Sequence, residues 1–125
     1  APNHEVNAMT ATTRVVLLLA VLGAGMLSLP GAHAANEEAA KTLARDNNCF
    51  KCHGVSKDKD GPAYNKVAEK YRGKPGAQEK LINHITSGEK AKFADGHEEA
   101  HKIVKTDPVN DMAQIKNLVD WILAQ

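Results

Sequence analysis

The stretch CFKCHG, residues 49–54, contains both cysteines of the 125-residue chain, and a histidine directly follows the second cysteine. A disulfide between Cys49 and Cys52 would close a very small loop and stabilise little, so this spacing is more typical of a redox or ligating site. A thioredoxin-like redox pair would need a βαβ pattern around it, and a structural zinc site would need a second pair of ligands. The surrounding sequence favours neither, which leaves covalent attachment of a group to the two thiols as the leading interpretation.

The N-terminal part of the chain has the pattern of an export segment. Residues 9–34 carry one positive charge at Arg14, then an apolar run over residues 15–22, and they end with small residues at Ala32 and Ala34. This pattern is typical of a secretory signal peptide, with cleavage expected after Ala34 or Ala35. A membrane anchor is less favoured, because glycine, serine and proline interrupt the apolar run short of the about 20 residues that span a bilayer.

The remaining sequence is expected to form one small domain over residues 35–125, and residues 1–8 are expected to have no structural role. Domains of this size often need a cofactor, a metal or disulfides to complete their core. Aromatic residues are few: the whole chain has two phenylalanines, two tyrosines and one tryptophan. An apolar group from outside the sequence would therefore help to complete the core. The formal net charge of +1 argues against a nucleic-acid partner for an exported domain.

Four segments predict helices, and none has the period-two alternation of a strand. The last one is the clearest, because its apolar residues form one stripe and Asp111 followed by Gln114 is a helix-start pattern. We therefore predict an all-α fold with long irregular loops. The predicted helices are residues 36–48, a short helix within 64–76 that stops at Gly73, residues 77–90 with an end at Gly88, and residues 111–125.

Cys-x-x-Cys-His at the end of a helix is the attachment sequence of c-type haem. The two thiols, here Cys49 and Cys52, add to the vinyl groups of the porphyrin, and the histidine, here His53, binds the iron from one face. The export pattern, the aromatic-poor core and the loop-rich helices agree with this interpretation. We therefore expect one covalently bound haem c.

Residues 36–125 resemble the class I cytochromes c, of the small bacterial periplasmic kind. The resemblance rests on the helix before CFKCH, on GPAYNKVAEKY at 61–71 and on IKNLVDWILAQ at 115–125. It implies a bundle of about four to five helices wrapped around the haem. Leu118 and Trp121 are expected to pack near the haem, where the first and last helices cross, and Pro62 and Trp121 are expected to belong to the cofactor-binding site. The resemblance also implies that the carbonyl of Pro62 accepts the Nδ1 proton of His53.

The second iron ligand is where this sequence departs from the family. The family usually places a methionine in the loop before the last helix, but counting back from Trp121 by the usual spacing reaches Lys105. Met112, the methionine that follows the export segment, is expected to be a core residue of the last helix. Neutral imidazole is also a good iron ligand. The resemblance therefore makes His101, which lies nearest the family's ligand position, the expected distal ligand.

The alternatives for the distal ligand are His97 and Met112. Ile103 and Val104 are expected to pack on the haem and to be the few apolar anchors of the charged loop 94–108. His84, inside a predicted helix, is expected to be a partly exposed histidine without a role. Residues 97–101 also spell HEEAH, a zinc-hydrolase motif. No apolar helix surrounds the motif, so a zinc hydrolase is not expected.

The function expected from these features is electron transfer in the periplasm by a one-electron Fe(III)/Fe(II) carrier that is not an enzyme. Its partners would be other redox proteins, without nucleic acid and without stable membrane insertion after processing. The alternative is a haem protein that binds or senses NO, CO or O₂ when its distal ligand leaves. Seven basic residues cluster in the segment after the first predicted helix. They are expected to form a solvated face, or else a docking patch for an acidic redox partner. These residues are Lys51, Lys57, Lys59, Lys66, Lys70, Arg72 and Lys74.

Overall fold

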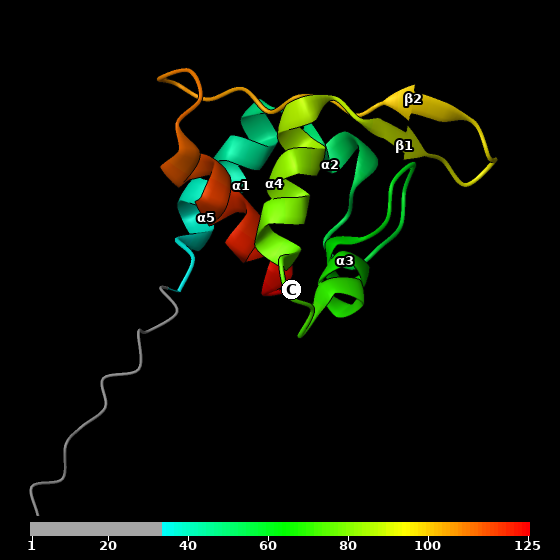
Figure 1. The fold of residues 1–125 in the computed structure, drawn as a ribbon, viewed down its shortest axis with the longest axis horizontal. Coiled ribbons are helices and arrows are strands. Elements are labelled where there is room, and N and C mark those ends of the chain that lie inside the picture. Colours follow the sequence, from blue (N-terminus) through cyan, green and yellow to red (C-terminus); the bar gives the residue numbers. More distant parts are fainter. Residues whose placement is uncertain (1–33) are drawn as a thin grey trace, which may run out of the picture. The chain divides into compact units, whose positions relative to one another are not determined.

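Five helices and one small hairpin make up residues 34–125, the part of the chain that this computed structural model describes (Figure 1). The predictions for the export segment and for residues 1–8 therefore lie outside the described residues. The expected all-α architecture is confirmed. In chain order the elements are α1 (Glu37–Asp46), α2 (Cys49–Cys52), α3 (Tyr64–Tyr71), α4 (Ala77–Ser87), β1 (Lys90–Lys92), β2 (Glu98–Ala100) and α5 (Met112–Leu123).

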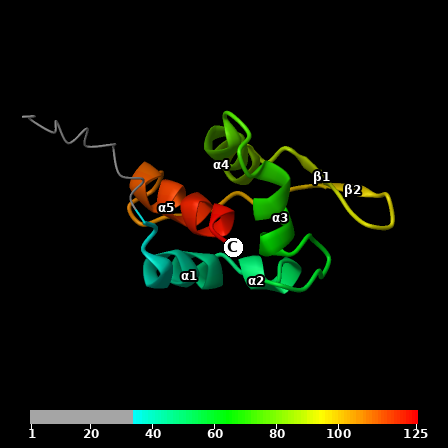
Figure 2. The ribbon, with the colours of Figure 1, turned by 90° about the horizontal axis from the view of Figure 1, so that it is seen from below.

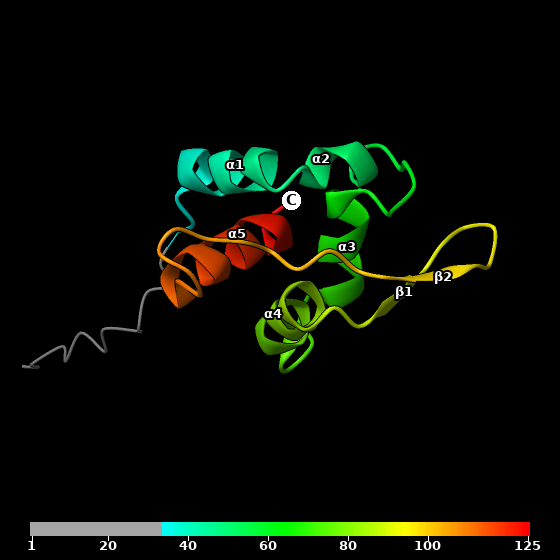
Figure 3. The same cartoon turned by 90° about the horizontal axis from the view of Figure 1, so that it is seen from above.

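Helix α5 is the centre of the packing, since it contacts α1, α3 and α4 (Figures 2 and 3). The apolar stripe predicted for this helix consists of Ile115, Leu118, Val119, Ile122 and Leu123. It is the buried face of the helix, although Leu123 is only partly buried. It meets the small residues Ala40 and Ala44 of α1, which are fully buried and allow the two helices to approach closely. Asn36 and Asn117 join the same two helices through a reciprocal pair of hydrogen bonds of 2.7 and 2.9 Å.

The chain breaks between the first helix and the cysteine motif, where the sequence predicts one helix through residue 48. Helix α1 ends at Asp46, and Asn48 takes a left-handed conformation with φ of +57°. Asparagine is among the few residues that tolerate this conformation. The break lets α2 begin in a new direction and turns its cysteines toward the space between α3 and α4.

The hairpin of β1 and β2 was not predicted from the sequence. Its strands pair antiparallel, with Lys90 opposite Ala100 and Lys92 opposite Glu98, and it extends away from the helices (Figures 1 and 3). Each strand has only three residues, and β2 is exposed along its whole length. Without a buried face there is no alternation of apolar and polar residues for a sequence pattern to report.

The loop between β2 and α5 is held by backbone groups more than by apolar side chains. The amide of His101 donates to the carbonyl of Glu89 at 2.9 Å, and the amide of Val104 donates to that of Ile85 at 2.8 Å. The side chain of Asn47 then pairs with both backbone groups of Lys105, at 2.7 and 2.9 Å. Ile103, expected to be an apolar anchor, is 54% exposed.

No helix within residues 34–125 has the length and the apolar character needed to cross a bilayer.

Candidate functional site

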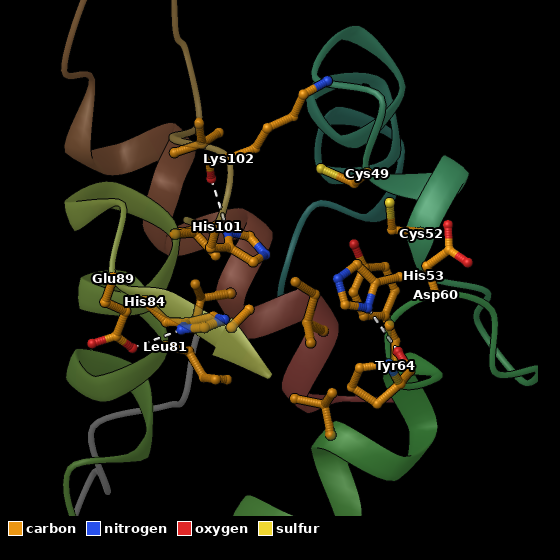
Figure 4. A pocket seen from close by; sticks show the side chains of 18 of the residues that line it. Cys49, Cys52, His53, Asp60, Tyr64, Leu81, His84, Glu89, His101 and Lys102 are labelled. Carbon is orange, nitrogen blue, oxygen red and sulfur yellow. Dashed lines mark hydrogen bonds and ion pairs between the residues drawn. The ribbon is translucent and has the colours of Figure 1, made fainter. Parts of the chain in front are cut away.

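A cleft of about 680 Å³ opens between the α2 segment, α3, α4 and the loop after β2. Its volume falls within the range of about 300–1,000 Å³ that is usual for cofactor and ligand sites. Figure 4 shows two facing walls, with Cys49, Cys52 and His53 on one side and His84 and His101 on the other. The CFKCH motif and the loop histidine His101 therefore line the same cleft.

The cysteine wall presents two thiols that are not joined to each other. Burial raises the pKa of the Cys49 thiol, and a hydrogen bond with Tyr64 partly opposes this shift. Cys49 is therefore a neutral thiol at physiological pH, in contrast to the thiolate of a redox-active pair. Cys52 lines the same cleft one helical turn further along α2.

His53 is held in one orientation by contacts on several sides. Its Nδ1 lies 2.7 Å from the carbonyl oxygen of Pro62, which is the contact that the family resemblance implied. The ring stacks on Tyr64 with centroids 5.1 Å apart and planes inclined by 13°. A Cβ atom at Gly61 would lie only 2.5 Å from Cε1 of His53, so glycine is required for this close approach. With Nδ1 donating to Pro62, Nε2 is left with the free lone pair.

His101 faces His53 across the cleft. The two ring centroids are 6.2 Å apart and the ring planes are inclined by 41°. The Nδ1 of His101 donates to the carbonyl of Lys102 at 2.8 Å, and Figure 4 shows the other ring nitrogen pointing into the cleft. Burial lowers the pKa of His101, which favours the neutral imidazole that can bind a metal.

The distance between these two rings can be compared with the distance expected for two imidazoles that bind the same metal ion. Two imidazoles on opposite sides of one ion, with metal–nitrogen bonds of about 2 Å and ring centres about 1 Å behind each nitrogen, have centroids about 6 Å apart. The observed 6.2 Å fits this arrangement. The two thiols, the apolar part of the cleft wall and the facing imidazoles together fit a covalently attached haem.

His84 is the site residue that sequence reasoning missed. It is only partly exposed, as expected, but it also lines the cleft, with its ring centroid 4.4 Å from that of His101. Its Nδ1 lies 2.6 Å from a carboxylate oxygen of Glu89. The signal was available, because His84 follows Leu81 by three residues and therefore shares the inward face of α4.

The two alternative ligands lie elsewhere. His97 is exposed in the hairpin turn, where it stacks on Phe93 with centroids 4.3 Å apart and pairs with Asp95 and Glu99. Met112, expected to be a core residue, is 45% exposed at the first position of α5, so that prediction was wrong. Neither residue lines the cleft.

The HEEAH motif has no zinc-site geometry. Residues 98–100 form β2, so His97 and His101 are not one helical turn apart as the zinc motif requires. Within residues 34–125, no group of three or more histidine, cysteine or acidic side chains is arranged to hold a metal ion.

Trp121, expected to belong to the cofactor-binding site, lies behind the cleft wall and does not line it, whereas Leu118 does. The indole is 3% exposed and meets Tyr64 and Phe50 edge to face, with centroids 5.6 and 6.2 Å apart. It therefore supports Tyr64, which in turn stacks on His53.

Six lysines line the cleft, together with three acidic residues, Asp60, Glu89 and Glu99. Of the basic cluster noted in the sequence, only Lys66 and Lys70 line it. The others that do so come from segments far along the chain: Lys80, Lys90, Lys92 and Lys102. The fold thus brings lysines that are distant in the sequence together around the cleft.

Comparison with known proteins agrees with this geometry. The chain matches the family model for cytochrome c over residues 37–125. It is 35% identical over 109 residues to cytochrome c-552 of Hydrogenobacter thermophilus, covering 86% of this chain and 94% of that protein. It is also 37% identical over 71 residues to cytochrome c-551 of Pseudomonas aeruginosa, covering 57% of this chain and 65% of that protein.

Solved structures give the same result. The class 1 cytochrome MtoD from Sideroxydans lithotrophicus ES-1 is 66% identical with a TM-score of 0.67, covering 73% of this chain and 97% of that one. Cytochrome c552 of Nitrosomonas europaea is 32% identical with a TM-score of 0.54, covering 67% of this chain and 96% of that one.

Proposed function

Because the chain belongs to the cytochrome c family and is a haem-based electron carrier with one covalently attached haem c, we propose that its iron is bound by two histidines, His53 and His101. The observation that carries this proposal is the placement of the two imidazoles on facing walls of the cleft, with centroids 6.2 Å apart. Within residues 34–125, none of the residues that line the cleft is a methionine, which agrees with this proposal.

The roles of the chain's own residues follow from their positions. Cys49 and Cys52 would hold the porphyrin through two thioethers, and His53 would be the proximal ligand. The bond from Nδ1 of His53 to Pro62 orients this imidazole and strengthens it as a donor. The haem supplies the Fe(III)/Fe(II) couple. Electron transfer makes or breaks no substrate bond, so we propose that the protein is a carrier and not an enzyme.

We place this carrier in the periplasm, where it would exchange electrons with partner redox proteins. The signal-peptide pattern of residues 9–34 supports export, and the lysines around the cleft support docking of an acidic partner near the haem. Such docking would weaken as ionic strength rises. The alternative function, sensing of NO, CO or O₂, is not favoured, since the family match supports electron transfer.

Spectroscopy of the ferric protein tests the two-histidine assignment. The weak far-red absorption band of methionine-ligated ferric cytochromes should be absent, and pulsed electron paramagnetic resonance with ¹⁵N-labelled histidine should detect two iron-bound imidazole nitrogens. The variants Met112→Leu and His97→Ala should leave this spectrum unchanged, because neither side chain lines the cleft. A far-red band that disappears in Met112→Leu would restore the family's ordinary histidine and methionine pair.

A further inference from the structure

We propose that His84 is a reserve iron ligand, which binds when His101 leaves and so keeps the iron closed to external small molecules. This inference rests on the proposed two-histidine function and extends it to a residue outside the haem-attachment motif. In the exchange, the bond between the iron and His101 breaks and one between the iron and His84 forms. No electron or proton is transferred in this step.

The first support is the orientation of the His84 side chain. Its Nδ1 donates to the Glu89 carboxylate at 2.6 Å, and Figure 4 shows the other ring nitrogen directed into the cleft, on the same side as that of His101. An imidazole whose Nδ1 is bound to a carboxylate keeps its lone pair on Nε2 and is a stronger donor. This arrangement is the usual one for a metal-ligating histidine.

The second support is proximity. The ring centroids of His84 and His101 are 4.4 Å apart, so a movement of about that length would bring His84 to the place that His101 leaves. His53 is bound on the opposite wall and need not move. The two imidazoles on this wall are therefore competitors for one coordination position.

The third support is that the two histidines belong to different elements. His101 follows β2 in the loop, whereas His84 lies in the regular helix α4. The loop is attached to α4 and its end by the bonds from His101 to Glu89 and from Val104 to Ile85. If these bonds open, the loop can withdraw while α4, which packs on α5, stays in place.

The experiment compares the ferric spin state and the rate of CO binding to the ferrous protein in holoprotein variants. His101→Ala should remain low-spin, with altered electron paramagnetic resonance g-values and slow CO binding. His84→Ala combined with His101→Ala should become high-spin and bind CO rapidly. The matched control, His97→Ala combined with His101→Ala, also removes two histidines but should behave like His101→Ala alone. If His101→Ala does not give folded holoprotein, His101→Gln keeps more of the side-chain volume and allows the same comparison.

The outcomes separate this inference from the proposed function. If His101→Ala alone is as high-spin and as rapid in CO binding as the double variant, His84 is not a reserve ligand, whereas His101 stays assigned. If the double variant keeps the wild-type low-spin spectrum, neither histidine binds the iron and the proposed function fails with the inference. Glu89→Gln in the His101→Ala background should accelerate CO binding, and an unchanged rate would overturn the part assigned to Glu89.

Discussion

The orientation of the His53 ring requires two things: the hydrogen bond with Pro62, and a residue at position 61 that has no Cβ atom. The space beside the imidazole is so narrow that a Cβ atom at this position would lie 2.5 Å from Cε1 and 2.9 Å from Nδ1. Contacts this short force a side chain or the backbone to move. The residue beside Pro62 therefore controls whether the His53–Pro62 bond can form.

Gly61→Ala should displace the His53 ring and break its bond with Pro62. We expect a loss of about 1–3 kcal/mol in the free energy of unfolding of the holoprotein, as for other overpacked sites. The potential should also change, because a less well oriented imidazole is a different donor. Denaturant titration and redox titration measure these effects. Ser56→Ala, at an exposed and uncharged position of the same loop that does not line the cleft, is the control, and equal behaviour of the two variants would contradict the steric argument.

Single residues were predictable where one motif determines the chemistry. Cys49, Cys52 and His53 share a cleft as the CFKCH spacing indicated, and the family resemblance led to the contact with Pro62. Met112 was misjudged, because its place on the apolar stripe did not reveal that the first turn of α5 is exposed. His84 was missed although its spacing from Leu81 places it on the inward face of α4, whereas its contact with Glu89, beyond the end of the helix, could not be predicted from helical spacing.

The start of α5 depends on a charged cap. Asp111 accepts hydrogen bonds from the amides of Ala113 and Gln114, and its second oxygen accepts one from the Gln114 side chain. The bonds from Gln114 and Ala113 lower the pKa of the Asp111 carboxyl. The carboxylate form is therefore the one that stabilises the helix start.

The stabilisation by Asp111 should depend on pH. Because its folded pKa is lowered, the contribution is complete above the ordinary pKa of the carboxyl and is lost as the pH falls through the folded value. The stability difference between the wild type and Asp111→Ala should therefore shrink in acid. Asp111→Asn, an uncharged cap, should show no such change relative to alanine. Denaturant unfolding of the holoproteins at a series of pH values checks this, and a constant difference between wild type and alanine would refute it.

Asn47 joins two elements that are distant in sequence. Its side-chain amide pairs with the backbone of Lys105 as a neighbouring strand would, because it donates to the carbonyl and accepts from the amide. Lys105 belongs to the loop that carries His101. The same amide also donates to the carbonyl of Leu43 at 3.0 Å. The end of α1 is thereby connected to the distal side of the cleft.

Asn47→Ala should loosen the loop and cost about 1 kcal/mol or somewhat more in stability, since typical net values are about 0.5–1.5 kcal/mol per hydrogen bond. Hydrogen exchange of the amides of Val104 and Lys105 should accelerate more than exchange in α5. Asp46→Ala, an exposed position at the end of α1, is the matched control. Unchanged exchange at Lys105 would show that the loop is held by other contacts.

At the level of elements, prediction succeeded where a helix has one buried face. Helices α3, α4 and α5 are found in their predicted segments, and α4 is followed by Gly88 in the left-handed conformation, as the predicted stop implied. The end of α1 was misplaced because the Asn47-Asn48 turn depends on tertiary bonds to Lys105. The hairpin was missed because its strands are short and largely exposed.

The hydrophobic core of the domain borders directly on the cleft. The buried cluster joins α1, α3 and α5 through residues that include Leu43, Tyr64 and Trp121. Leu81, Leu118 and Ile122 line the cleft itself, so part of the apolar face of α4 and α5 is turned toward the cofactor site. Burial of such faces supplies about 25 cal/mol per Å².

Export and haem attachment should leave a recognisable covalent product. We predict that the mature protein begins at Ala35 or Asn36 and carries one haem, because the signal pattern ends at Ala34. Intact-mass measurement of protein from a periplasmic extract gives the start site and the haem together. A purified species that still contains Arg14 would contradict the signal-peptide prediction.

The dependence of the fold on its cofactor gives the last prediction. Cys49→Ala and Cys52→Ala should each leave at most one thioether, which mass spectrometry under denaturing conditions detects. The double variant should lack covalent haem, and its apolar cleft wall would then be open to water. We expect it to lose most of its helical circular dichroism and its cooperative unfolding transition. Lys51→Ala, an exposed position between the two cysteines, should retain both. A double variant that contains no haem but has native helical content would show that the packing of α1, α3 and α5 suffices alone, and that the haem is not needed to complete the core.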